Sequence, residues 1–166
     1  RARRSRALEI LAPEGAALDL AVLRVVVAVV LGASGGVAVA DHWAALPREA
    51  WVAPLGVGWL LPHLSISPSL VRGARVVLWI ACVAGGLGIF SRTSFAIASL
   101  AAAYVLLIPQ LGGSVFHDHH LLWLAVLLAA SPCGDALGID AWWARRRGAP
   151  RPLRGRAHGA AIRVAW

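Results

Sequence analysis

The fold is decided by the stretch DLAVLRVVVAVVLGASGGVAVA, which occupies residues 19–40. A helix needs roughly 20 predominantly apolar residues to cross the hydrocarbon core of a bilayer, and this run is long enough, with Arg24 as its only charge after Asp19. A signal peptide does not explain the run, because a signal core has only about 7–15 apolar residues and begins close to position 1. The stretch therefore predicts a membrane-spanning helix.

Three further apolar runs follow, at residues 70–90, 94–111 and 121–132. The last has twelve uninterrupted apolar residues, so a crossing helix would have to begin near Ser114 and draw the segment FHDHH into the membrane or its interface. A re-entrant or interfacial segment is the alternative for so short a run. The pattern predicts an all-α, polytopic transmembrane bundle of about four spanning helices.

The connection between the first two spans, residues 41–69, is expected to lie at the membrane surface. Proline removes a backbone donor and breaks a helix, so this stretch does not predict a fifth span. Tryptophan suits the headgroup level because its indole can keep one edge in water. The residues concerned are Pro47, Pro54, Pro62 and Pro68, with Trp43, Trp51 and Trp59.

Composition gives the same answer independently. The chain has 166 residues, of which 59% are hydrophobic and 14% charged, and its mean hydropathy is +0.71. Soluble domains are nearer 45–50% apolar and about 25% charged, so the composition excludes an ordinary soluble domain. Every basic residue is Arg, which excludes a lysine Schiff base or general base. Cys82 and Cys133 lie in different segments and form neither a disulfide framework nor a metal-binding spacing.

The arginines predict the orientation. The formal net charge is +8, and the charge is concentrated in the two tails. By the positive-inside rule, a multi-pass protein of the cell membrane with both termini in the cytoplasm is expected. We divide the chain into a basic cytoplasmic tail (1–16), a transmembrane domain (17–143) and a second basic tail or linker (144–166). The expected partners are the lipid bilayer and anionic lipids at the Arg-rich tails, not nucleic acid.

The densest polar cluster is Phe116, His117, Asp118, His119 and His120. On a helix His117 and His120 share a face, so one turn supplies at most two imidazoles to a metal, which needs further ligands. The simplest interpretation is a polar helix start, with Asp118 favoured by the helix dipole. Catalysis or ligand contact stays open beside it, because ionisable groups at membrane depth are often functional.

Two other features of the spans carry predictions. Arg24 could extend its side chain to the interface, or it needs a partner inside the membrane, for which Asp118 or a ligand oxygen would serve. Gly32 and Gly36 form a G-x-x-x-G pattern, and further glycines follow in the second span. Small residues allow helix backbones to approach closely in lipid, so tight helix packing is expected at both places.

Four short stretches carry a family resemblance. They are LDLAVLR (18–24), GLGIFSR (86–92), DHHLL (118–122) and LGID (137–140). In this order, they resemble the horizontally transferred transmembrane (HTTM) domain family, which includes the vitamin K-dependent gamma-carboxylases and their bacterial relatives. The resemblance implies a helical membrane domain in which the histidine matching His119 assists catalysis, with Asp118 where the family has Asn.

The same resemblance implies reduced vitamin K or another quinol as cofactor, and a carboxylase (lyase) activity. In the carboxylases a lysine on a later helix acts as base toward the quinol, oxygen converts the quinol into a strong base, and carbon dioxide adds to the glutamate carbanion. This chain reaches Trp166 before such a helix and has no Met at position 1. We therefore expect the N-terminal part of a longer protein.

Three interpretations stay open. The first is the N-terminal part of a quinol-using, carboxylase-like enzyme with His119 and Asp118 in its site and Arg24 as a ligand-binding candidate. The second is a non-catalytic membrane module or a small DoxX-like integral membrane protein. The third is a small metal or proton site formed by His117, Asp118 and His120.

Overall fold

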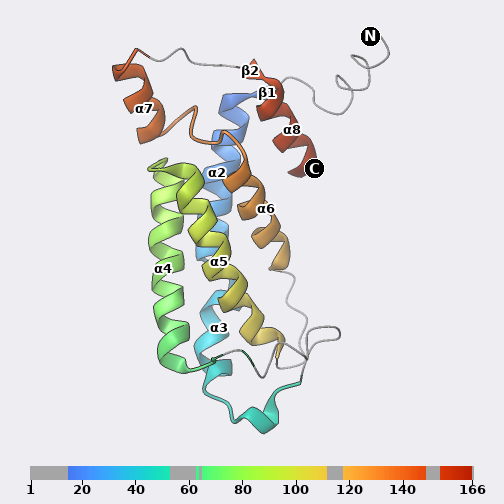
Figure 1. Ribbon diagram of the computed structural model, residues 1–166. Helices are drawn as coiled ribbons and strands as arrows, with labels where there is room; N and C mark the ends of the chain where they lie inside the picture. The colour runs from blue at the N-terminus through green and yellow to red at the C-terminus, as the bar shows by residue number, and fades with distance from the viewer. Residues whose placement is uncertain (1–14, 53–62, 64, 112–117, 149–153, 166) are drawn as a thin grey trace.

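A computed structural model describes residues 15–52, 63, 65–111, 118–148 and 154–165 (Figure 1). Within these residues, three helical segments are long enough and apolar enough to cross a membrane: Ala17–Ala44, Pro68–Leu87 and Ser91–Gln110. The predicted helical, membrane-type architecture is confirmed. The count of four spanning helices is not, because the fourth apolar run forms a helix of only 12 residues, His119–Ala130.

The first span is broken. Helix α2 runs over Ala17–Gly32 and helix α3 over Gly35–Ala44, and α3 continues beyond α2 along the bundle (Figure 1). The Ser34 hydroxyl accepts a hydrogen bond from the Val37 amide at 3.4 Å and so caps α3. Glycine and serine are poor helix formers and commonly mark kinks, which explains the interruption at this point.

The second and third spans form an antiparallel hairpin of helices α4 (Pro68–Leu87) and α5 (Ser91–Gln110). Pro68 occupies the first turn of α4, where its missing amide proton costs nothing, and the Ser67 hydroxyl caps that end by accepting from the Leu70 amide. Gly88 ends α4 with a φ of +74°, the left-handed conformation that glycine adopts most easily.

The remaining elements gather beside this hairpin. Helix α6 (His119–Ala130) starts partway along the bundle and runs toward the end that carries the α4–α5 turn (Figure 1). Helix α7 (Ile139–Arg146) lies at that same end. A short 3-10 helix, η1 (Arg48–Ala50), lies at the opposite end, and residues 53–62 and 64 of the predicted surface segment fall outside the described residues.

The two described ends of the chain meet. Strand β1 (Gly15–Ala16) pairs antiparallel with strand β2 (Arg154–Gly155), and helix α8 (Arg156–Ala165) follows. A Cβ on Gly15 would lie 2.7 Å from the Cα of Gly159, so α8 packs backbone to backbone on β1. The Arg-, Pro- and Gly-rich composition predicts a poorly ordered tail up to Arg156, and for residues 154–156 this prediction is wrong because of that close packing. We call this end of the bundle the terminal end.

The core is thin, and much apolar surface is exposed. Leu20, Leu31, Leu78 and Phe95 are fully buried where α2, α4 and α5 meet. Many large apolar side chains on the outside of α2 and α4 are half exposed or more, including Val29 and Ile80, each 64% exposed. Contiguous exposed apolar surface on this scale is typical of contact with lipid, in agreement with the predicted bilayer partner.

Candidate functional site

Asp118 lies at the break in the first span. Its Oδ2 accepts a hydrogen bond from the backbone amide of Gly36 at 2.9 Å. That amide belongs to the first turn of α3 and has no partner within its own helix. A Cβ on Gly36 would lie 2.6 Å from the same oxygen, so only glycine leaves room for the carboxylate. Asp118 also immediately precedes α6, so one carboxylate lies at the N-termini of two helices, where the dipoles favour negative charge.

The break lies well inside the first span. The 16 residues of α2 lie on one side of it and the 10 residues of α3 on the other. At 1.5 Å per residue these helices are about 24 Å and about 15 Å long. A hydrocarbon core is about 30 Å thick, so Asp118 lies at a depth where an ionisable group is costly and usually has a function.

His119 and His120 begin α6 on its exposed side. Their rings lie 4.2 Å apart between centroids, with a 34° angle between the planes. The two side chains line different grooves. His119 lines one of about 440 Å³ with Leu106, Leu107 and Leu122, whereas His120 lines one of about 550 Å³ between α6 and α8. The predicted pair of Asp118 and His119 thus combines a buried-side carboxylate with an imidazole that faces an apolar groove.

The metal hypothesis gains no further ligands. In the part of the chain that the structure describes, no three His, Cys, Asp or Glu residues cluster closely enough to hold a metal ion. His117, which the sequence groups with His120, lies outside the described residues.

Arg24 is fully buried at the terminal end of the bundle, away from Asp118. Its Nη1 donates to the carbonyl oxygens of Cys133 at 2.8 Å and Ala136 at 3.3 Å, and its Nη2 donates to the carbonyl oxygen of Leu137. Twelve residues of the first span separate Arg24 from Gly36, about 18 Å of helix. The partner inside the bundle is therefore the backbone of residues 133–137, and the pairing of Arg24 with Asp118 does not form.

Asp140 joins the same end of the bundle together. Its Oδ1 accepts from the Phe90 amide at 2.9 Å, and its Oδ2 accepts from the amide and the hydroxyl of Ser91, both at 2.8 Å. Its own amide donates to the carbonyl of Gly88 at 2.7 Å. This carboxylate caps α5 from another part of the chain. Sequence reasoning assigned no role to Asp140, although the LGID stretch marked its position.

Glycine makes this junction possible. A Cβ on Gly138 would lie 3.0 Å from the Cα of Gly88 and 3.1 Å from both terminal nitrogens of Arg24. Two backbones and a guanidinium therefore meet without intervening side chains. We call Arg24, Gly88, Gly138 and Asp140 the polar junction. Three of the four stretches that carry the family resemblance contribute to it.

Cys133 is buried in the polar junction's loop. Its thiol donates to the carbonyl of Leu128 at 3.3 Å. Burial raises the pKa of the Cys133 thiol above its ordinary value, and the nearby positive charge of Arg24 opposes that rise only in part. A thiol in this state stays protonated at neutral pH and is a poor nucleophile.

A second buried polar contact attaches α8. The Nε2 of His158 lies 3.0 Å from Oδ2 of Asp135, and the His158 side chain is 3% exposed. Asp135 belongs to the loop between α6 and α7, so this pair ties the last described helix to the terminal end. The sequence gave no signal for it, because the partners are 23 residues apart and lie in segments without periodicity.

Three comparisons, with protein-family models, with curated proteins and with solved structures, find no match to this chain.

Proposed function

We propose that Asp118 and His119 form an acid–base site within the membrane that acts on a lipid-soluble quinol, in the N-terminal part of an HTTM-like, carboxylase-like protein. The observation that carries this proposal is the location of Asp118 at the break of the first span, beside an imidazole that lines an apolar groove. The family resemblance supports it independently, since His119 matches the histidine that assists catalysis in the carboxylases.

The groove fits the quinol class chemically. A quinol ring is flat and apolar with hydroxyl groups at its edge, and the groove beside His119 is walled by leucine side chains of α5 and α6. Imidazole accepts or donates a proton near neutral pH, which suits it to the hydroxyl of such a ring. The bound quinol would supply the reducing equivalents of the reaction, while this chain's residues orient its ring and exchange its hydroxyl proton.

Asp118 has a supporting role in this proposal. Its carboxylate is held by the Gly36 amide, so the start of α6 has a fixed position relative to α3. The negative charge close to His119 favours the protonated imidazole that follows proton uptake. In the carboxylases the principal base is a lysine of a later helix, so carboxylation itself requires a longer chain.

The test compares two adjacent histidines. The protein in lipid nanodiscs is titrated with reduced vitamin K1, and bound quinol is measured after the discs are separated from free quinol. His119→Ala is expected to weaken binding at least about tenfold, while His120→Ala, which removes the same side chain from a different groove, leaves binding unchanged. Equal effects of the two substitutions, or none, would contradict the proposal.

A non-catalytic membrane module is the second candidate. It is favoured by the polar junction, where Arg24 and Asp140 bond only to this chain's own backbone and Ser91. Under this alternative, native protein and His119→Ala are equally inactive in every quinone-dependent assay.

We also propose that both termini face the cytoplasm. The concentration of arginine in the two tails supports this orientation through the positive-inside rule. Pairing of β1 with β2 supports it further, because it holds residues 15–16 and 154–155 at one end of the bundle. Reporter fusions at each end test it: a reporter that is active only outside the cytoplasm is expected to stay inactive at both.

A further inference from the structure

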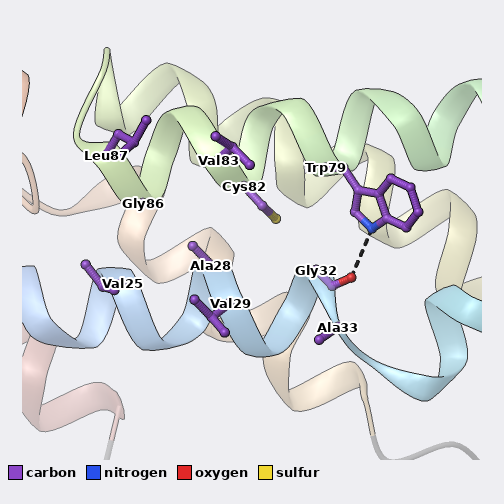
Figure 2. Close-up of a pocket in the computed structure, with 10 residues that line it drawn as sticks. All are labelled: Val25, Ala28, Val29, Gly32, Ala33, Trp79, Cys82, Val83, Gly86 and Leu87. Atoms are coloured by element: carbon purple, nitrogen blue, oxygen red, sulfur yellow. Dashed lines mark hydrogen bonds between the residues drawn. The ribbon is translucent and has the colours of Figure 1, made fainter.

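An apolar groove separates α2 from α4 on the lipid-facing side of the bundle (Figure 2). Its volume is about 550 Å³. The small residues Ala28, Gly32, Cys82 and Gly86 form its floor, because none of them carries a side chain long enough to fill it. Val29 and Val83 line its edges and are 64% and 63% exposed, so the groove opens toward lipid. We call it the α2–α4 groove.

A tryptophan closes one end of the α2–α4 groove. The Nε1 of Trp79 donates to the carbonyl oxygen of Gly32 at 2.9 Å (Figure 2). That carbonyl is available because α2 ends at Gly32, so no later amide of the same helix occupies it. On Trp79, the guanidinium of Arg75 lies 5.3 Å from the ring centroid. The indole is therefore held on two sides, and the groove ends at it.

The length of the groove selects its occupant. Along α4 it extends from Trp79 to Leu87, which is eight residues or about 12 Å of helix. One leaflet contributes about half of a hydrocarbon core of about 30 Å. A spanning helix of a second copy packs along several turns on both sides of the midplane, and Trp79 limits the groove to one side. The groove therefore matches a single hydrocarbon chain that enters from the leaflet at the terminal end.

The open end of the groove carries positive charge. Leu87 is followed by Gly88, whose carbonyl accepts from the amide of Asp140 in the first turn of α7. On α7, Arg146 stacks over Trp142 at 4.0 Å and Arg147 over Trp143 at 5.9 Å, and both arginines are exposed. Paired tryptophan and arginine at the end of a span are suited to the headgroup level of an anionic leaflet.

We propose that the α2–α4 groove and helix α7 together bind one anionic phospholipid. One acyl chain occupies the groove as far as Trp79, and the phosphate contacts the arginines of α7, which are Arg145, Arg146 and Arg147. This site is separate from the groove beside His119 and does not depend on the proposed quinol chemistry.

Native mass spectrometry of the protein released from detergent tests the proposal. The protein is titrated with phosphatidylglycerol and, separately, with phosphatidylcholine that carries the same acyl chains. The expected result is one retained phosphatidylglycerol per chain, with phosphatidylcholine retained at least about tenfold less.

Two variants divide the site into its parts. Gly32→Leu fills the groove, and a Cβ there would meet only Trp79 Cδ1 at 3.9 Å and Cys82 Cβ at 4.0 Å, so the fold can accept it. Its control is Gly73→Leu, the same change on α4 at a position with nothing within 4 Å. The second variant changes Arg145, Arg146 and Arg147 to Gln, and its control changes Arg1, Arg3 and Arg4 to Gln.

The groove variant and the α7 variant are each expected to lower phosphatidylglycerol retention at least about tenfold, and both controls to leave it unchanged. Equal retention of the two lipids, or undiminished binding in Gly32→Leu, would overturn the proposal. So would an equal loss in the two arginine variants, which would indicate general charge attraction. A dimer that Gly32→Leu dissociates would assign the groove to a second copy instead.

Discussion

Asp118 and Gly36 are 82 residues apart in the sequence, yet the carboxylate of one accepts the amide hydrogen of the other at 2.9 Å. The contact joins the start of α6 to the start of α3 inside the first span. A helix terminus inside a membrane must satisfy its amides from elsewhere in the protein, since lipid offers no acceptor. Asp118 supplies that acceptor, and this explains how the first span tolerates a break.

Gly36→Ala is expected to destabilise the protein. The added Cβ would lie 2.6 Å from Asp118 Oδ2 and 3.0 Å from Leu106 Cδ2, so the carboxylate must move and its hydrogen bond is lost. Overpacking of this kind costs about 1–3 kcal/mol. Unfolding in mixed detergent micelles with increasing dodecyl sulfate measures the change. Gly35→Ala, one residue earlier with nothing within 4 Å, is the control and is expected to be neutral.

Arg24→Lys tests the polar junction. The guanidinium spans three carbonyl oxygens, and an ammonium on a single point cannot reproduce that spread. Leaving buried carbonyls without donors costs about 1–3 kcal/mol in the free energy of unfolding. Arg72→Lys, on the exposed surface of α4, should change little. If both variants unfold at the same denaturant concentration as native protein, the three bonds of Arg24 do not contribute to stability.

Asp140→Ala removes the cap of α5. The carboxylate accepts bonds from two consecutive backbone amides and from the Ser91 hydroxyl, and loss of a helix cap costs about 0.5–2 kcal/mol. Amide hydrogen exchange should accelerate at Phe90 and Ser91 before it changes elsewhere in α5. Asp19→Ala removes an exposed acid from the first turn of α2 and serves as the control. Unchanged exchange at Ser91 would be evidence against the cap.

Cys133 predicts a pH dependence of stability. Burial raises the pKa of this thiol in the folded protein, so the unfolded chain loses its proton first as the pH rises. The folded state therefore keeps its full stability below about pH 8.5 and loses stability progressively above it. Denaturant unfolding of native protein and of Cys133→Ala should diverge above that pH and run in parallel below it. Parallel curves at all pH values would refute the assignment.

His158→Ala is expected to release α8. Removal of the imidazole leaves Asp135 without this partner and opens a space under the helix, so α8 should detach more often. Trypsin cleavage after Arg163, measured by mass spectrometry, should become faster than in native protein. His42→Ala, an exposed histidine at the far end of α3, is the control. The attachment is disproved if the two substitutions leave the cleavage rate equal.

The candidate site was predicted in its members but not in its arrangement. Asp118 and His119 were chosen from local composition, because a carboxylate and imidazoles stand out beside an apolar run. The separate grooves of His119 and His120 depend on α5 and α8, which no local pattern relates to them. Arg24 was correctly singled out as a buried charge in need of a partner, but its acceptors lie 109 to 113 residues away.

The sequence by itself determined that this chain is a bundle of apolar helices and where the long ones lie, within a few residues. Spanning a bilayer is a local property: a helix satisfies its own backbone hydrogen bonds, and about 20 apolar side chains pay for its transfer into lipid. Only the tertiary structure decided how Gly36 meets Asp118 and how Arg24, Gly88, Gly138 and Asp140 form one junction. These contacts depend on backbones that approach closely after the helices pack, and a linear pattern carries no information about which distant glycines will face each other.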